Sequence, residues 1–271
     1  MTRQYCHIGS RTIAYLDSAP KHDELRVLVL LHAFPLGANL WEPQMRSVPK
    51  GWRLITPDLR GFGGSTELDS LSALSMQDYA DDVVDLLEEL GIKRAVIGGC
   101  SMGGYAALAL YASRPELFEG LIIANSRAGA DSPEARANRR NMLALVDREG
   151  PSGIAKDMLP RLLGKTTMET NSSIEAFVRR LIKQQSPTAI HNAIHRMMNR
   201  PDSMPLLGKV SVPTLVITGA EDEMIPVDES RRMADAVTGA KLVIIPGAGH
   251  LSNLEQPEAF NSAVNAFLTA L

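Results

Sequence analysis

The chain has 271 residues, of which 45% are hydrophobic and 22% charged, and its formal net charge is −3. This composition is typical of a soluble globular protein, and the slightly acidic balance favours neither nucleic acid nor a membrane surface as a partner. The two cysteines, Cys6 and Cys100, imply no disulfide framework, and the first ten residues lack the apolar stretch of a signal peptide. We therefore expect a cytoplasmic protein, and its oligomeric state stays open.

In chain order, short apolar runs alternate with helical patterns. The runs are rich in β-branched residues and do not alternate with polar ones, as expected for strands of a parallel sheet covered on both faces. Together they predict an α/β fold with a doubly wound, mostly parallel sheet. The expected strands are Arg26–Leu31, Arg53–Thr56, Ala95–Ile97, Leu121–Ala124, Thr214–Ile217 and Leu242–Ile245, and the expected helices begin after an N-cap at Ser75, run from Ser101 to Ser113, and end the chain from Pro257 to Leu271.

One long segment interrupts this alternation. Between Ser126 and Lys209 helical patterns broken by prolines replace the strands. We expect a helical cap over residues 126–209, inserted into an α/β core formed by residues 1–125 and 210–271. The cap contains 14 Lys and Arg against 8 Asp and Glu. It either steers an anionic substrate or only presents solvated helix faces and surface ion pairs. Arg127, just past a predicted strand, is the candidate partner for a substrate carboxylate.

A glycine-rich turn follows the third expected strand. Gly99, Ser101 and Gly103 form the pattern G-x-S-x-G between a strand and a helix. Such a turn holds a serine in a strained conformation that bulky residues two positions away would block, so Ser101 is the candidate nucleophile. Cys100 is a rival nucleophile. Centred on Cys100, however, the pattern has Met102 where the second glycine should stand.

A serine hydroxyl needs a nearby base, and the base needs a carboxylate that orients it. Of six histidines, only His250 follows a late strand and a glycine-rich loop. The acid should lie between the serine and the histidine in the chain. The residues alone leave four acids open: Glu221, Asp222, Glu223 and Asp228.

At this point the chain resembles the α/β-hydrolase family over nearly all of its length. The family has G-x-x-D after a late strand, and Gly219 and Asp222 match it, which selects Asp222 as the acid. His250 matches the family's G-x-G-H. Residues 58–65 resemble the D-x-R-G-x-G-x-S turn, a recognition feature rather than a catalytic one.

A further motif concerns the oxyanion. Residues 32–35 resemble the family's H-G-x-P, with Ala33 in place of the glycine. The resemblance implies that the backbone N–H of Phe34 and that of Met102 bind the oxyanion, and that His32 is structural. Within the family, the stretch Asn125–Arg139 looks most like that of 3-oxoadipate enol-lactonases and related carboxylesterases.

Taken together, these residues predict a serine hydrolase that cleaves a small-molecule ester or lactone through an acyl-serine. No cofactor or metal is expected, and the i, i+4 pair His191 and His195 lacks a third ligand in the sequence. A C–C bond hydrolase, a thioesterase or a cofactor-free perhydrolase would use the same three side chains. A ligand-binding receptor with this fold is the remaining alternative.

Overall fold

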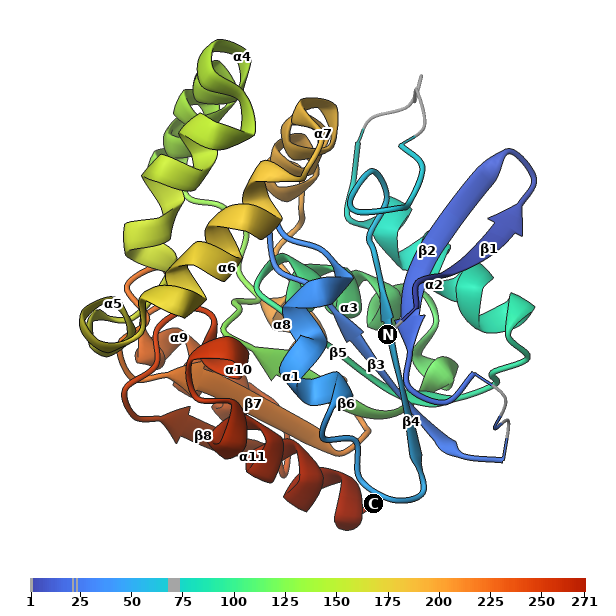
Figure 1. The fold of residues 1–271 in the computed structure, drawn as a ribbon. Helices are drawn as coiled ribbons and strands as arrows, with labels where there is room; N and C mark the ends of the chain where they lie inside the picture. The colour runs from blue at the N-terminus through green and yellow to red at the C-terminus, as the bar shows by residue number, and fades with distance from the viewer. Residues whose placement is uncertain (1, 21, 23, 68–73) are drawn as a thin grey trace.

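The structure, a computed structural model, describes residues 2–20, 22, 24–67 and 74–271. An eight-stranded sheet in the order β1-β2-β4-β3-β5-β6-β7-β8 forms its centre (Figure 1). β2 pairs antiparallel with β1 and β4, and the other neighbouring strands are parallel. The strands are β1 (Gln4–Ile8), β2 (Arg11–Asp17), β3 (Arg26–Leu31), β4 (Trp52–Pro57), β5 (Ala95–Cys100), β6 (Phe118–Ala124), β7 (Thr214–Gly219) and β8 (Lys241–Ile245).

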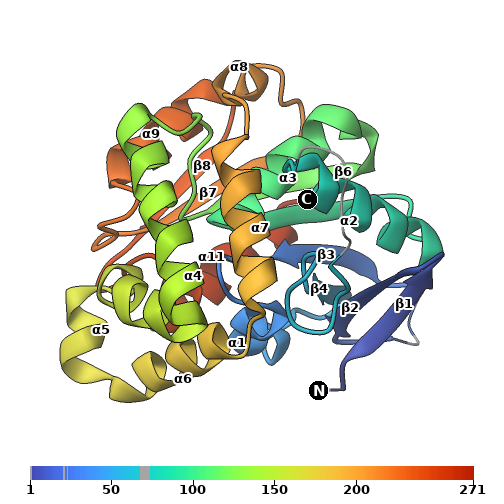
Figure 2. The same cartoon turned by 90° about the horizontal axis from the view of Figure 1, so that it is seen from above.

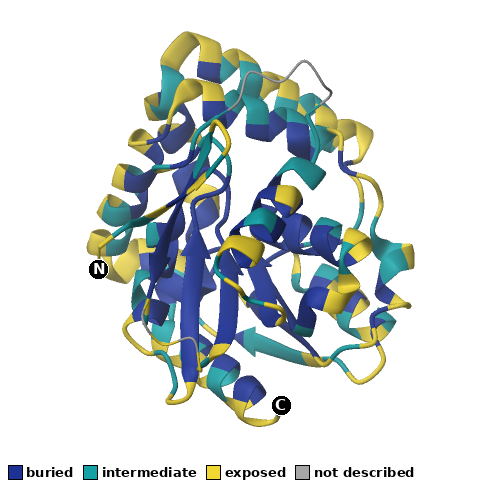
Figure 3. Ribbon diagram, turned by 90° about the vertical axis from the view of Figure 1, so that its right-hand side faces the viewer, coloured by how far each residue is buried: buried dark blue, intermediate teal, exposed yellow. Residues whose placement is uncertain are grey.

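The predicted α/β fold with a mostly parallel sheet is confirmed, and the six expected strands correspond to β3–β8. The hairpin of β1 and β2 was not predicted. β2 lies between β1 and β4 and is buried from Ile13 to Asp17, so its apolar run is of the same kind as those that predicted the other strands. Figure 3 shows the buried strands enclosed by helices whose outer surfaces are exposed.

Helices cover both faces of the sheet (Figure 2). One face carries α2 (Gln77–Glu89), α3 (Met102–Ser113) and α9 (Val227–Ala236), and the other carries α1 (Glu42–Met45) and α11 (Pro257–Thr269). The short helices η1 (Ala38–Trp41), η2 (Pro115–Leu117) and α10 (Ser252–Glu255) lie in connections.

The expected N-cap at Ser75 is wrong. Met76 already has helical dihedral angles and is the N-cap of α2, without a side-chain hydrogen bond. The side chain of Asp78 accepts a hydrogen bond from the Ser75 backbone N–H at 3.2 Å, so Ser75 contacts the first turn of α2 through its backbone.

Five helices connect β6 to β7. They are α4 (Pro133–Leu162), α5 (Lys165–Thr170), α6 (Ser172–Lys183), α7 (Pro187–Met198) and α8 (Met204–Leu207), and α4 is broken at Gly150, which has φ 60° and ψ −158°. In Figures 1 and 2, α4 lies beside α7 over one edge of the sheet, and α6 packs against α4 and crosses one end of this pair. We propose that residues 126–209 are the cap. In the part of the chain that the structure describes, no helix has both the length and the apolarity needed to cross a membrane.

Candidate active site

The candidate site lies where four parallel strands end. Ser101 follows β5, Asn125 follows β6, Asp222 follows β7 and His250 follows β8. The register places the ends of neighbouring strands together, with Cys100 opposite Ala124 and Gly219 opposite Ile245. Side chains from four distant parts of the sequence therefore meet at one edge of the sheet.

The turn after β5 holds Ser101 at φ 52° and ψ −112°, a backbone conformation that residues other than glycine rarely adopt. The two glycines of the motif allow the close approach that this turn requires. A Cβ at Gly99 would lie 2.3 Å from the carbonyl carbon of Gly103, and one at Gly103 would lie 2.1 Å from the Leu31 oxygen. The turn thus depends on both glycines.

Cys100 occupies a different environment from its neighbour. It is the last residue of β5, is 1% exposed, and places its Sγ 3.7 Å from the His250 carbonyl oxygen. Burial raises the pKa of this thiol, with a smaller contribution from the charge of Asp222. The reactive thiolate is therefore disfavoured. Ser101, and not Cys100, lines the cavity described below.

His250 and Asp222 form a buried pair. Nδ1 of His250 lies 2.9 Å from Oδ2 and 3.1 Å from Oδ1 of Asp222. The Asp222 Oδ1 also accepts hydrogen bonds from the backbone N–H groups of Met224 and Ile225, each at 2.9 Å. Burial alone would raise the pKa of Asp222, but the charge and hydrogen bond of His250, with the amide donors, hold that pKa below its usual value.

The other three candidate acids do not contact His250 in the described structure. Glu221 accepts hydrogen bonds from the backbone N–H of Thr166 at 2.8 Å and from its hydroxyl at 2.6 Å, so it binds the cap. Glu223 and Asp228 are exposed. The geometry thus singles out Asp222 from the four acids that the residues alone left open.

Sequence reasoning missed the part that Asn125 plays. Its Nδ2 donates to Asp222 Oδ2 and to the Gly249 carbonyl, both at 3.0 Å, and its Oδ1 accepts from the Ser252 hydroxyl at 2.5 Å. The signal was present, since Asn125 is a polar residue directly after an apolar strand, level with the other strand ends.

Glu255 was missed as well. Its Oε1 accepts hydrogen bonds from the backbone N–H groups of Gly249 at 2.9 Å and Leu251 at 3.1 Å, on either side of His250. Its Oε2 accepts from the Gly164 N–H of the cap at 2.7 Å. Burial raises the pKa of Glu255, although these hydrogen bonds oppose the shift. This buried carboxylate joins the histidine loop to the cap.

The two residues expected at the oxyanion, Phe34 and Met102, are both buried beside Ser101. Met102 is the first residue of α3, so its N–H is among the helix-terminal donors that have no acceptor within the helix. His32 is fully buried, with Nδ1 2.9 Å from the Ala33 oxygen and Nε2 accepting from the Leu59 N–H at 3.0 Å. Burial lowers the pKa of His32, so this neutral ring fastens two loops together.

A cavity of about 80 Å³ connects these residues to the cap. Three arginines reach it, and their environments differ. Arg139 pairs with Asp131 at 2.6 Å and Arg161 pairs with Asp157 at 2.6 Å. Arg127 donates only to the Met224 carbonyl, at 2.9 Å, and no carboxylate of the described chain pairs with it. The cavity is lined by Phe34, Ser101, Tyr105, Arg127, Arg139, Met142, Met158, Arg161, Met197, Met224, Ile225 and His250.

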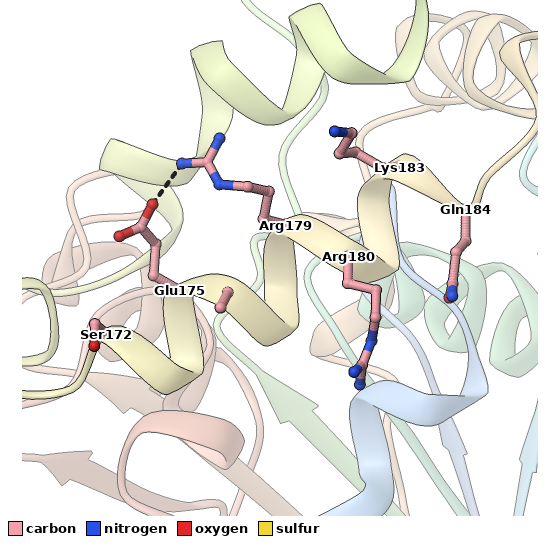
Figure 4. Close-up of a pocket in the computed structure, with 7 residues that line it drawn as sticks. Ser172, Glu175, Arg179, Arg180, Lys183 and Gln184 are labelled. Carbon is pink, nitrogen blue, oxygen red and sulfur yellow. Dashed lines mark hydrogen bonds and ion pairs between the residues drawn. The ribbon is translucent and has the colours of Figure 1, made fainter.

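A larger hollow, of about 470 Å³, lies along α6 (Figure 4). Arg179, Arg180 and Lys183 line it, and Glu175 pairs with Arg179. None of the candidate site residues borders this hollow. Elsewhere in the described ranges, no group of three or more His, Cys, Asp or Glu side chains is arranged to hold a metal ion.

Comparison with known proteins gives the family. A model of the alpha/beta hydrolase fold matches residues 26–257. The chain is 30% identical to 3-oxoadipate enol-lactonase 2 of Acinetobacter baylyi, over 88% of each protein. It is 36% identical to a malate-bound thermophilic esterase from Thermogutta terrifontis, with a TM-score of 0.92 and coverage of 100% of this chain and 99% of that one.

A second solved structure agrees with this result. The enol-lactonase from Burkholderia xenovorans is 27% identical and has a TM-score of 0.89, over 98% of this chain and 100% of that one. The match of the family model to most of the chain, together with these similarities, shows that the protein belongs to the α/β-hydrolase family.

Proposed function

We propose that the protein is a serine hydrolase that cleaves a small-molecule carboxylic ester or lactone through an acyl-serine intermediate. The observation that carries this proposal is one cavity that Ser101 and His250 both line, with Asp222 paired to the far nitrogen of the histidine. The similarity to esterases and enol-lactonases supports ester or lactone chemistry.

In this mechanism Ser101 attacks the carbonyl carbon of the ester while His250 takes the hydroxyl proton. Asp222 keeps the imidazole oriented and stabilises the imidazolium that forms. The backbone N–H groups of Phe34 and Met102 stabilise the oxyanion. The imidazolium then protonates the leaving alkoxide, and water, deprotonated by His250, releases the acid and restores the serine hydroxyl.

The substrate proposed here is small and bears an anionic group. Three cationic side chains of the described chain reach the 80 Å³ cavity, and no carboxylate is among the described residues that line it. Arg127 is the expected partner of a substrate carboxylate, because its charge has no acidic neighbour in the described structure. The similar esterase was crystallised with malate, a dicarboxylate, which agrees with this substrate class.

The test is hydrolysis of short-chain p-nitrophenyl esters by the wild type, Ser101→Ala and Cys100→Ala. We expect Ser101→Ala to lower kcat by at least about 10⁴-fold, since losing the nucleophile removes the whole acyl-enzyme route. Cys100→Ala is the matched control, one residue away and buried, and should keep kcat within about threefold. Turnover that survives Ser101→Ala would exclude this mechanism. A folded wild type without turnover would favour a narrow C–C hydrolase or a receptor instead.

A further inference from the structure

A second hollow adjoins the proposed catalytic cavity. This side cleft, of about 170 Å³, lies between the start of α2, one side of α3 and the segment that follows α7. Tyr105 and Arg127 line both the side cleft and the catalytic cavity. These two side chains therefore lie at the junction of the two spaces.

Two arginines line the side cleft, and one of them, Arg200, is paired with Asp131 behind it. The other is Arg127, and no carboxylate is among the described lining residues of the cleft. The Nε atoms of both arginines are buried without a hydrogen-bond partner in the described structure. Buried N–H donors are rarely left unsatisfied, so these two favour a ligand that carries acceptors.

Arg200 is held in place by its other two nitrogens. Nη1 pairs with Asp131 at 2.8 Å, and Nη2 donates to the Gly129 carbonyl at 3.0 Å. The guanidinium lies 4.1 Å from the centre of the Tyr105 ring, and the residue is only 4% exposed. A side chain fixed in this way presents its remaining donor without further ordering, which favours binding.

The rest of the side cleft is lined by apolar side chains and by three polar ones, Ser75, Gln77 and Ser203. Leu108, Ala109 and Ala112 of α3 face Met76 and Pro201 across it. Ala112 is exposed, so the cleft opens to solvent at this rim. An aliphatic chain fits the apolar walls, and a carboxylate fits the two arginines.

We propose that the side cleft is a second ligand site, which binds the carboxylate end of a small aliphatic acid between Arg127 and Arg200. The role of this acid as part of the substrate rests on the function proposed above. The binding of the acid to the side cleft does not depend on that function. Arg127, at the junction, would then hold the substrate from the cleft side while the ester lies against Ser101.

Binding is tested with glutarate, a five-carbon dicarboxylate, and the Ser101→Ala protein by titration calorimetry. Ala112→Trp, added to this protein, places a large side chain at the rim of the cleft, at a residue that does not line the catalytic cavity. We expect it to weaken the Kd for glutarate at least tenfold, and Ala109→Trp, deeper in the cleft, to do the same. Ala176→Trp is the matched control, an exposed helical alanine of α6, and should leave Kd within twofold.

Three results would overturn the site: no glutarate binding to the parent, equal Kd values for the Ala112→Trp and Ala176→Trp proteins, or a Kd that Arg127→Gln leaves unchanged. In the active enzyme, Ala112→Trp should leave kcat/KM for p-nitrophenyl acetate within twofold and lower that for the p-nitrophenyl monoester of glutarate at least tenfold. Glutarate binding without ester turnover would contradict the proposed function alone, and ester turnover without glutarate binding would contradict the side cleft alone.

Discussion

The carboxylate of Asp222 receives hydrogen bonds from three parts of the chain. Two come from the backbone of its own loop, one from His250 and one from the Asn125 side chain. A carboxylate with this many donors keeps its charge while buried, because each donor replaces water that burial removed. Asn125 is the donor that also binds the Gly249 carbonyl, so it sets the distance between the acid and the histidine loop.

Asn125→Ala tests this positioning. The amide of Asn125 helps to hold the pKa of Asp222 below its usual value, so its removal raises that pKa. Because the mechanism needs the ionised acid, the acid limb of the kcat/KM profile should move to higher pH. We also expect kcat to fall about tenfold, equivalent to about 1.4 kcal/mol, the size of one lost hydrogen bond to a charged group. Steady-state kinetics between pH 4 and pH 9 measure both effects.

Ser252→Ala is the control for this variant. It removes only the hydroxyl that donates to the Asn125 oxygen and leaves the bond to Asp222 in place. It should lower kcat by less than about threefold and leave the acid limb where it is. If Asn125→Ala lowers activity with an unshifted acid limb, the asparagine supports the fold of the loop and does not act on the acid.

At the scale of elements, the cap is fastened directly to the loop that carries the base. The backbone N–H of His250 donates to the Leu162 carbonyl, at the end of α4, at 3.1 Å. A Cβ at Gly249 would lie 2.3 Å from the Gly164 nitrogen, so the two backbones touch. Glu255 binds both sides of this contact. A shift of α4 would therefore move the imidazole.

We predict that Glu255→Gln weakens the contact between the cap and the loop that carries His250. Glutamine keeps one acceptor oxygen but turns an NH₂ group toward backbone donors, which leaves at least one N–H unsatisfied and costs about 1–3 kcal/mol. We expect kcat to fall about tenfold with little change in KM, and Tm to fall by a few degrees, about 2–4 °C per kcal/mol for a chain of this size. Glu221→Gln is the matched control, because Glu221 binds Thr166 of the cap through its side chain but not the His250 loop. Equal losses of kcat in both variants would contradict a specific effect on the histidine.

The elements of the fold were largely predictable, and the contacts of the site were not. Six runs of buried, mostly β-branched residues suffice for β3–β8, and one glycine-rich turn marks Ser101 as a candidate, because these patterns are local. Asn125 and Glu255 find their partners 97 and 91 residues away, at Asp222 and Gly164, which no local pattern encodes. The pairing of Asp222 with His250 is likewise not encoded by a local pattern. The sequence therefore selected Asp222 among the four acids only through the family resemblance.

Across the whole molecule, buried arginines join distant segments. Arg196 of α7 is fully buried and pairs with Asp78 of α2 at 2.9 Å and with Glu67 at 3.1 Å, which ties the cap to the core. Asp131 ties the two ends of the cap, through Arg139 of α4 at 2.6 Å and Arg200 at 2.8 Å. The residue at the centre of each cluster, Arg196 or Asp131, is buried, so the loss of a partner leaves a buried charge less well paired.

Asp131 makes the stability of the protein depend on pH. Burial alone would raise the pKa of Asp131, but Arg139 and Arg200 together lower it below the usual value. A lowered pKa in the folded state stabilises the fold above the unfolded pKa, about 3.9, and this contribution is lost as the pH falls through the folded pKa. Asp131→Asn should therefore lower the free energy of unfolding by about 3 kcal/mol at pH 7, since it leaves buried arginines unpaired.

The difference between Asp131→Asn and the wild type should then shrink as the pH falls from about 5 to 3, because the wild type protonates the same carboxyl. Urea unfolding of both proteins at pH 7, 5, 4 and 3 measures this difference. Asp228→Asn is the control: Asp228 is exposed and lies 3.8 Å from Arg231, a surface pair worth little. A constant difference at all four pH values would mean that Asp131 acts through packing and hydrogen bonds alone, without a contribution from its charge.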